Sequence, residues 1–273
     1  MAKIKGDHMK NYMILSCLSV LFFLQLNLAY AKTLYVGDGN HLTIQSAVNA
    51  ANDGDEIIVK PGTYTENIRV DKSLCIRSEK GYTHTTINAK SSYSRGFYIT
   101  KNNVTIDGFT VCKTFNESAI ELASADKCRI INNRLGFEGC VNETSIELYY
   151  SDNNTITNNI CSKNNLDGIY MEASHHNDIS QNIIQDNQST GIDIDKESTA
   201  NVISQNTLSS NQDYGIRLYE NSSSNYIYLN SFIDNTIAPI KTYVEHQNIW
   251  YSQDVITYEY HGKRFCGLLG NYY

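Results

Sequence analysis

A gapless internal repeat of 23 to 24 residues constrains this chain more than any other feature of its sequence. Each clear copy opens with Asn-x-Ile-x-x-Asn, and the copies start at Asn154, Asn177, Asn201 and Asn225. A second block opens with Gly-Ile and follows the first three copies, at Gly168, Gly191 and Gly215. Degenerate copies upstream extend the pattern over at least residues 104–235. A repeat of this period indicates a solenoid, in which each unit packs only on its neighbours.

The strands implied by this repeat are too short to form a stable sheet alone. Segments such as Ile192-Asp193-Ile194 alternate apolar and polar residues, which is typical of a half-buried strand. Stacking the units at about 4.8 Å would pair every strand in parallel with its copies and bury a continuous apolar core. We therefore predict an all-β fold, a single-stranded right-handed parallel β-helix solenoid. Leucine-rich repeats are the nearest alternative, but isoleucine and asparagine hold the key positions here.

Recurrent asparagines are predicted to stabilise the stack and not to bind a ligand. Stacked amides can hydrogen bond along the solenoid axis, and asparagine tolerates left-handed turn conformations. Two such positions recur in the repeat: Asn159, Asn182, Asn206 and Asn230 at one, and Asn164, Asn187, Asn211 and Asn235 at the other.

Both ends of an open stack need a cover, because end strands expose unpaired backbone groups. Residues 42–51 predict a short amphipathic capping helix with Thr43 as its N-cap, and residues 56–59 begin the first rung. After Asn235 the repeat fades, and residues 250–273 predict an irregular, tyrosine-rich C-terminal cover. The expected parts are an N-terminal strand and capping helix at 32–55, the β-helix at 56–240 and the C-terminal cap at 241–273.

Residues 1–31 resemble an export signal. Basic residues precede an apolar stretch at 12–28, and Ala29-Tyr30-Ala31 provides small residues for cleavage. The alternative is a membrane anchor, against which Gln25 and Asn27 interrupt the apolar stretch. The expected protein is secreted or at the cell surface, periplasmic in a diderm bacterium, and not integral to the membrane after cleavage. Its net charge of −7 argues against a nucleic-acid partner, which needs a basic surface.

Six cysteines follow the predicted signal, and an exported protein can oxidise them. Cys161 shares the apolar position of Ile184 and Leu208 and should point inward, and Cys140 lies about one rung earlier. A Cys140–Cys161 disulfide and two buried free thiols are both compatible with this spacing. Six N-x-S/T sequons add weak evidence of surface exposure: Asn103, Asn116, Asn142, Asn153, Asn187 and Asn221.

The two ends and the repeat together resemble a known superfamily. Residues 33–36, Gln45-Ser46-Ala47-Val48 and the stretch 54–64 look like the start of pectin-lyase-like β-helix proteins. The repeat is similar to that of the NosD-like family, named for a periplasmic accessory protein of copper-site maturation. Residues 257–265 and 269–272 look like the end of such domains in archaeal cell-surface proteins, where the tail usually continues further. The resemblance implies the fold but not an activity, because members range from lyases to structural repeats.

Two outward columns of the repeat form the predicted binding face for a polysaccharide or cell-envelope glycan. With isoleucine and leucine inward, the alternate positions point outward. Carboxylates can accept hydrogen bonds from sugar hydroxyls, and tyrosines can stack on sugar rings. An ordinary solvated face is the alternative, since outward positions are normally polar. The predicted ligand-binding residues are Glu121, Glu147, Tyr149, Tyr170, Glu172, Asp193, Asp195, Arg217 and Tyr219.

An enzymatic alternative uses the same face. Glu172 and Asp195 occupy matching positions on adjacent rungs, about 5 Å apart in the backbone, which suits a retaining glycosidase pair. A lyase would need a calcium site and a nearby arginine, for which Asp193, Asp195 and Arg217 are the candidates. The signatures of β-helix galacturonases and alginate epimerases do not occur in the sequence.

Metal binding is a further alternative. His175 and His176 could hold copper, but adjacent residues on a strand or turn point apart, so one at most joins a common centre. Calcium on Glu172, Asp193 and Asp195 is chemically more plausible. No cofactor is required by the leading hypothesis, a non-catalytic carbohydrate-binding or surface-structural protein. A polysaccharide lyase or glycosidase comes second, and a copper-site accessory protein third.

Overall fold

The computed structural model describes residues 31–91, 95–114, 116–243, 247–260 and 263–273. Lys32–Tyr273 forms one compact unit, and the predicted export signal lies outside the described residues apart from Ala31. Across the described segments, no helix has both the length and the hydropathy needed to cross a membrane.

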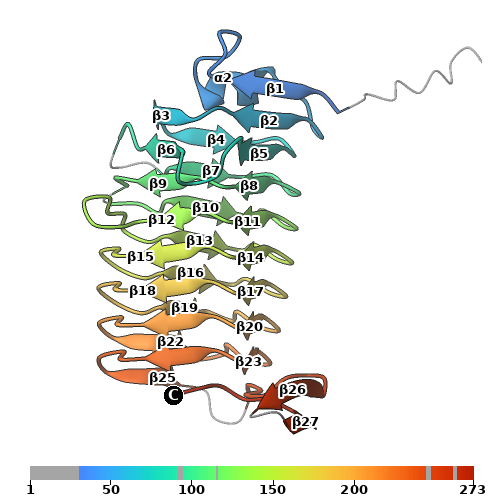
Figure 1. Ribbon diagram of the computed structural model, residues 1–273, viewed down its shortest axis with the longest axis vertical. Helices are drawn as coiled ribbons and strands as arrows, with labels where there is room; N and C mark the ends of the chain where they lie inside the picture. The colour runs from blue at the N-terminus through green and yellow to red at the C-terminus, as the bar shows by residue number, and fades with distance from the viewer. Residues whose placement is uncertain (1–30, 92–94, 115, 244–246, 261–262) are drawn as a thin grey trace, which may run out of the picture. The chain divides into compact units, whose positions relative to one another are not determined.

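Three parallel sheets wrap around one core, so that each rung contributes one strand to each sheet in turn (Figure 1). We name them sheets A, B and C in the order in which the chain visits them. Sheet A contains β1 Thr33–Val36, β2 Glu56–Val59, β5 Cys75–Ser78, β8 Thr105–Asp107, β11 Arg129–Ile131, β14 Thr155–Thr157, β17 Asp178–Ser180, β20 Val202–Ser204 and β23 Tyr226–Tyr228. Sheet B contains β3 Gly62–Thr65, β6 Thr85–Asn88, β9 Thr110–Cys112, β12 Arg134–Leu135, β15 Ile160–Ser162, β18 Ile183–Gln185, β21 Thr207–Ser209 and β24 Ser231–Ile233. Sheet C contains β4 Ile68–Val70, β7 Phe97–Ile99, β10 Ile120–Ala123, β13 Ile146–Tyr149, β16 Ile169–Glu172, β19 Ile192–Asp195, β22 Tyr214–Leu218 and β25 Ala238–Thr242.

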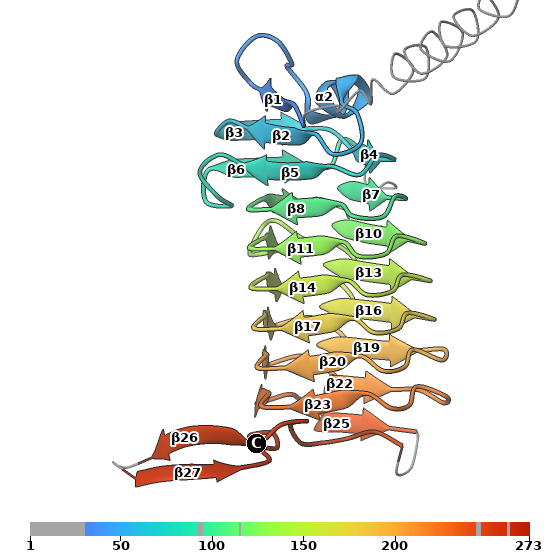
Figure 2. The ribbon, with the colours of Figure 1, turned by 90° about the vertical axis from the view of Figure 1, so that its right-hand side faces the viewer.

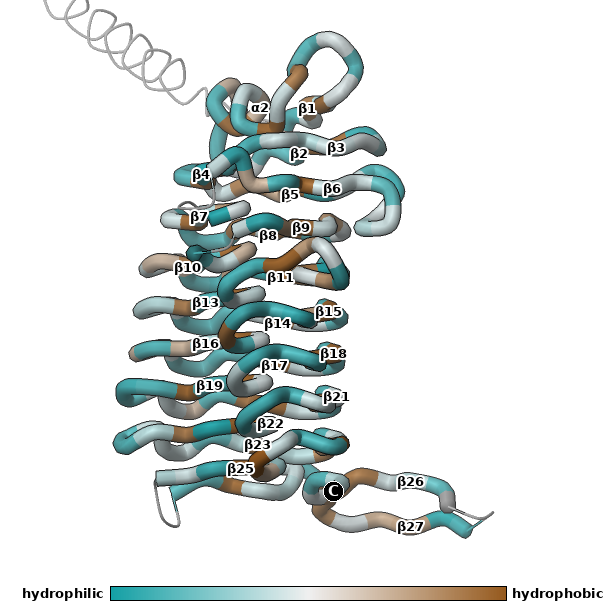
Figure 3. Tube along the Cα trace, turned by 90° about the vertical axis from the view of Figure 1, so that its left-hand side faces the viewer, coloured by the Kyte–Doolittle hydropathy of each residue, from teal (hydrophilic) through white to brown (hydrophobic). Residues whose placement is uncertain are grey.

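The core is a stack of apolar columns, as the repeat predicts. Ile169 pairs with Ile192, and Ile192 with Ile216, in register along sheet C, and all three are fully buried. Apolar and hydrophilic positions alternate along the coils (Figure 3). The parallel β-helix expected from the sequence is therefore confirmed.

Each corner of the coil combines one left-handed residue with a buried polar residue that follows it. Asn158, Gln181 and Gln205 have positive φ, and the ladder asparagines come directly after them. The expectation that the ladder asparagines themselves adopt left-handed turns is therefore wrong. The turn is made by the exposed neighbour, which leaves the asparagine side chain free to point inward and bond along the axis.

The two predicted asparagine ladders are present, and two more accompany them. The Asn182 Oδ1 accepts hydrogen bonds from the Asn159 backbone N–H at 2.9 Å and from its Nδ2 at 3.1 Å. The Asn182 Nδ2 in turn donates to Asn206 Oδ1 at 3.0 Å. A third ladder continues through the opening asparagines of the repeat, Asn154, Asn177, Asn201 and Asn225. The fourth, the serine ladder, lies between sheets C and A and joins Ser151, Ser174 and Ser198. Ser222 is buried at the matching position of the next rung.

The first end is covered as predicted. Helix α2 Ile44–Ala50 begins after Thr43, whose side chain accepts from the Ser46 backbone N–H. Ile44, Ala47 and Val48 are buried in the apolar core.

The second end differs from the irregular cover that was expected. Strands β26 Ile256–Tyr260 and β27 Lys263–Gly267 form an antiparallel hairpin beside the last rung (Figure 2). On either side of it, Asn248 and Asn271 continue two ladders, because their Oδ1 atoms accept from the backbone N–H groups of Asn225 and Asn230. The tail therefore adds one incomplete rung, part of which precedes the hairpin and part of which follows it.

The disulfide joins Cys112 to Cys140, with 5.0 Å between their Cα atoms. Both alternatives left open by the sequence are wrong for Cys140, which is bonded to Cys112 and is neither paired with Cys161 nor a free thiol. The inward position of Cys161 is confirmed, because it is a completely buried free thiol. Cys112 ends a sheet B strand and Cys140 lies on the loop that passes beside it in the next rung, so loop geometry and not strand register brings the two sulfurs together.

Candidate functional site

The two predicted columns run along the outer surface of sheet C in continuous register. Glu121 pairs with Glu147, Glu147 with Tyr170, and Tyr170 with Asp193. Arg217 continues this first column, and the second runs through Tyr149, Glu172 and Asp195. Sheet pairing also adds residues that the sequence analysis missed, at both ends of the first column: Arg69, Tyr98 and Lys241.

Two carboxylates of the first column are buried, which differs from a simple solvated face. Asp193 is only 2% exposed, and Arg217 lies over it and donates from Nε to its Oδ1 at 3.1 Å. Burial raises the pKa of Asp193 to about 6, although the hydrogen bond from Arg217 opposes this. Glu121 is covered in the same way by Arg95. These ion pairs hold the two carboxylates in place, so neither carboxylate is free to receive a ligand.

Glu147 lies between the two buried pairs without a cation of its own on the adjacent strands. Burial, together with the neighbouring Glu121 carboxylate, raises its pKa to about 7. This part of the column therefore changes its charge near neutral pH.

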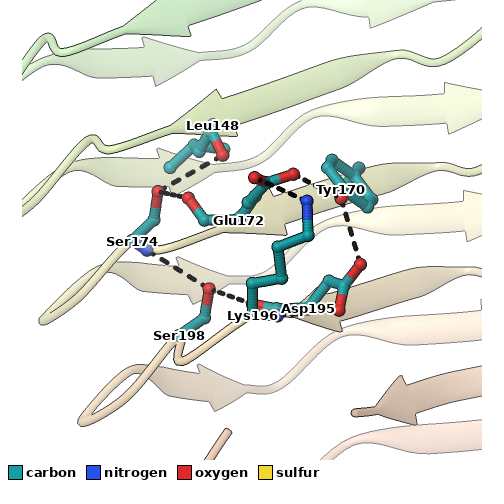
Figure 4. Close-up of polar contacts among 7 residues, drawn as sticks. All are labelled: Leu148, Tyr170, Glu172, Ser174, Asp195, Lys196 and Ser198. Carbon is teal, nitrogen blue, oxygen red and sulfur yellow. Dashed lines mark hydrogen bonds and ion pairs between the residues drawn. The ribbon is translucent and has the colours of Figure 1, made fainter. Parts of the chain in front are cut away.

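Glu172 and Asp195 of the second column are partly exposed, and Tyr170 lies between them (Figure 4). The Tyr170 hydroxyl is 3.0 Å from Glu172 Oε2 and 3.2 Å from Asp195 Oδ2. The Lys196 Nζ donates to Glu172 Oε1 at 2.9 Å. Desolvation, together with the hydrogen bond to Glu172, raises the pKa of Tyr170, so this hydroxyl stays protonated and can donate to either carboxylate.

A groove of about 750 Å³ opens where this pair meets the corner between sheets C and A. It crosses five successive rungs, those of β13, β16, β19, β22 and β25. The predicted residues Glu172, Asp195 and Tyr219 line it. The other lining residues were not singled out by the sequence analysis: Tyr150, Ala173, Lys196, Glu197, Glu220, Asn221 and Tyr243.

The groove has a local cause in the chain length of this corner. Between the second column and the serine ladder, the corner has one residue in the β13 and β16 rungs and two in the β19 and β22 rungs: Tyr150 and Ala173, against Lys196 with Glu197 and Glu220 with Asn221. The added residue pushes the later corners outward and leaves a recess beside the shorter ones. The step from 23 to 24 residues in the repeat was the available sequence signal for this recess.

Tyrosines form one end of the groove. The Tyr219 and Tyr243 rings stack with their centroids 5.4 Å apart and their planes 15° apart. Arg217 lies over the Tyr219 ring and Lys241 over the Tyr243 ring, at 5.0 and 4.8 Å from the centroids. By contrast, Tyr149 and Tyr170 contact each other in a tilted pair and do not line the groove.

The histidines lie apart from the groove, on the turn that follows it. His175 Nδ1 is 2.9 Å from Thr199 Oγ1, whereas His176 adopts a left-handed conformation and is exposed. The described segments contain no group of three or more His, Cys, Asp or Glu side chains arranged to hold a metal ion. The residues around His175 therefore do not fit a copper centre.

The fold and this groove define a class: a parallel β-helix protein with an aromatic and acidic groove on the outside of one sheet. The family described as periplasmic copper-binding protein (NosD) matches residues 48–273, so the chain belongs to the NosD family.

A curated relative is similar over a shorter stretch. The cell surface glycoprotein of Methanothermus fervidus is 39% identical over 94 residues, which are 34% of this chain and 15% of that protein.

Solved structures share the fold at low sequence identity. Pectate lyase Pel9A has a TM-score of 0.57 and 15% identity, with 80% of this chain and 79% of that chain covered. The catalytic domain of a GH87 alpha-1,3-glucanase in complex with nigerose has a TM-score of 0.61 and 16% identity, with 74% and 39% covered. The periplasmic alginate epimerase AlgG has a TM-score of 0.52 and 17% identity, with 70% and 65% covered.

Proposed function

We propose that this chain is a cell-surface member of the NosD family that binds a polysaccharide or cell-envelope glycan without cleaving it. The groove beside Glu172, Asp195 and Tyr219 is the observation that carries the proposal. It combines stacked aromatic rings with carboxylates that can accept hydrogen bonds from hydroxyl groups, and it is long enough to follow a linear chain across several rungs.

The comparisons support this direction at a coarser level. The family is described as periplasmic, and the relative from Methanothermus fervidus is a cell surface glycoprotein, so both point to a place outside the cytoplasm. Two of the solved structures with this fold act on polysaccharides, a pectate lyase and a glucanase. Because their sequence identity to this chain is low, the ligand has to be inferred from the residues of this chain.

A binding role fits the side chains better than catalysis does. Glu172 is held by Lys196 and by the Tyr170 hydroxyl, and Asp195 accepts the backbone N–H of Lys196 at 2.7 Å. Asp193 and Arg217 are committed to each other. A nucleophile and a general acid need freedom to contact the substrate and transfer a proton, which these bonds restrict.

A glycosidase is the second candidate, favoured by the two groove carboxylates, Glu172 and Asp195, that both contact the Tyr170 hydroxyl. Incubation with polysaccharides, followed by assays of reducing ends and unsaturated products, separates the two functions. The binding proposal expects no turnover. Turnover by the wild-type chain that Asp195→Asn abolishes would overturn it.

Binding itself can be tested on a glycan array with a matched pair of tyrosine variants. Tyr243→Ala removes an exposed ring from the groove, whereas Tyr35→Ala removes an exposed ring from the outer face of β1. We expect Tyr243→Ala to weaken glycan binding at least tenfold and Tyr35→Ala to leave it unchanged. Equal effects of the two substitutions would remove the groove from the proposal.

A further inference from the structure

We infer that the groove selects glycans carrying protonated amines, such as chains of glucosamine without N-acetyl groups. This inference rests on the proposed function and names the substrate class for the same site. It separates the chain from the acidic polymers that the names pectate lyase and alginate epimerase indicate for two of its structural neighbours.

The net negative charge of the lining residues favours a cationic ligand. Four carboxylates line the groove, and Lys196 is the one cation among the lining residues. Lys196 pairs with Glu172, which leaves Asp195, Glu197 and Glu220 without a cation in the ion pairs of the described segments. A hollow with an excess of one charge concentrates ligands of the opposite charge.

The positions of these carboxylates place the negative charge where a ligand in the groove would pass. Glu197 and Glu220 are exposed and stand on the lengthened corners, one rung apart, while Asp195 lies on the sheet at the end of β19. An amine on successive sugar residues would therefore meet a carboxylate on either side of the recess. Charge-assisted hydrogen bonds of this kind are about twice as strong as neutral ones.

The aromatic end of the groove adds a packing surface. Arg217 and Lys241 already lie over the Tyr219 and Tyr243 rings, so the chain's own cations occupy these faces. The ring carbons of an amino sugar can still pack on the exposed part of Tyr243. The lining carboxylates attract the amines of such a sugar and repel a uronate carboxylate.

Isothermal titration with four probes tests the inference at a pH where the amine is protonated. The probes are a glucosamine hexamer, its N-acetylated equivalent, a galacturonate hexamer with and without calcium, and spermine. We expect the glucosamine hexamer to bind at least tenfold more tightly than the other three, with affinity that falls as salt is added.

Matched charge variants locate the effect. Glu197→Gln combined with Glu220→Gln should reduce glucosamine binding at least tenfold. Glu79→Gln combined with Glu138→Gln removes the same charge from exposed positions outside the groove and should leave binding unchanged.

Each contrary result has its own meaning. Tighter binding of galacturonate, with or without calcium, overturns the inference but leaves a glycan-binding groove. Equal binding of the acetylated and free-amine hexamers overturns it in the same way, and equal binding of spermine makes the groove a polyamine site. No binding of any glycan, on the array or by titration, removes the proposed function as well.

Discussion

At the residue scale, Glu147 should make the stability of the protein depend on pH. Its pKa in the folded protein, about 7, lies above the ordinary value of 4.5 because the side chain is buried and faces Glu121. The folded state therefore holds the proton more tightly than the unfolded state does. The resulting stabilisation is complete below about pH 4.5 and is lost as the pH rises through 7, with a magnitude on the order of 2–3 kcal/mol.

Glu147→Gln removes this titration while it keeps the side-chain shape. We expect the variant to exceed the wild type in free energy of unfolding only slightly at pH 5 and by much more at pH 8, both measured by urea denaturation. Glu138→Gln is the control, since this side chain is 89% exposed and should change stability little at either pH. A Glu147→Gln variant that gains no stability between pH 5 and pH 8 relative to the wild type would show that Glu147 ionises freely in the fold.

The buried pair of Asp193 and Arg217 leads to a second prediction at this scale. Arg217→Met leaves a 2% exposed carboxylate with no cation, which should cost about 3–5 kcal/mol of stability at pH 8. The loss should be smaller at pH 5, because Asp193 can then become neutral by binding a proton. Combining Arg217→Met with Asp193→Asn should recover part of the loss, as measured in a double-mutant cycle. Additive losses at pH 8 would refute the coupling.

At the scale of the elements, the asparagine ladders hold successive corners together. Asn182→Ala would leave the Asn159 backbone N–H and the Ile156 carbonyl without their partners in a buried corner. Each unsatisfied group costs about 1–3 kcal/mol, so the variant should lose about 2–4 kcal/mol in urea denaturation. Gln181→Asn changes the adjacent exposed left-handed residue and should stay within about 0.5 kcal/mol of the wild type. Similar losses from both substitutions would contradict a specific role of the ladder.

The sequence predicted those structural elements that arise from residue patterns repeated in every rung. Apolar alternation fixes which side chains enter the core, so the stacked positions of Ile169, Ile192 and Ile216 followed from pattern alone. The ladders followed in the same way, because a recurring buried amide can bond only along the axis. Their left-handed neighbours were assigned to the wrong residue, since Gln181 and Gln205 carry no strong sequence signal for that conformation.

Elements that occur once could not be predicted from the repeat. The Cys112–Cys140 disulfide depends on the path of one loop, and the hairpin of β26 and β27 interrupts the final rung without a counterpart upstream. The same holds for the candidate site. Its two columns were predicted, but the groove arises from one extra corner residue, whose effect on the surface depends on the shorter corners beside it.

At the scale of the whole molecule, the solenoid sorts the six sequons into two groups. Corners place side chains either outward or into a ladder, so the acceptor asparagine is accessible in some sequons and enclosed in others. The exposed asparagines are Asn103, Asn116, Asn153 and Asn221. Asn142 and Asn187 are fully buried, and their amides bond to Thr114 and Asn211 respectively. A glycan cannot be accommodated on an amide that is enclosed by the core.

Expression in a host that exports the chain and glycosylates N-x-S/T therefore has a residue-specific outcome. Mass spectrometry of the folded protein should find glycans only on the four exposed asparagines. Asn153→Gln should remove one glycan with little change in stability, because Asn153 is exposed beside the ladder. Asn187→Gln should remove none and should destabilise the protein, because it breaks the ladder bond to Asn211. A glycan found on Asn142 or Asn187 would contradict the burial of these two side chains.

Asn221 lines the groove, so a glycan attached there would compete with any external ligand. Asn221→Gln should then bind glycans more tightly than the glycosylated wild type.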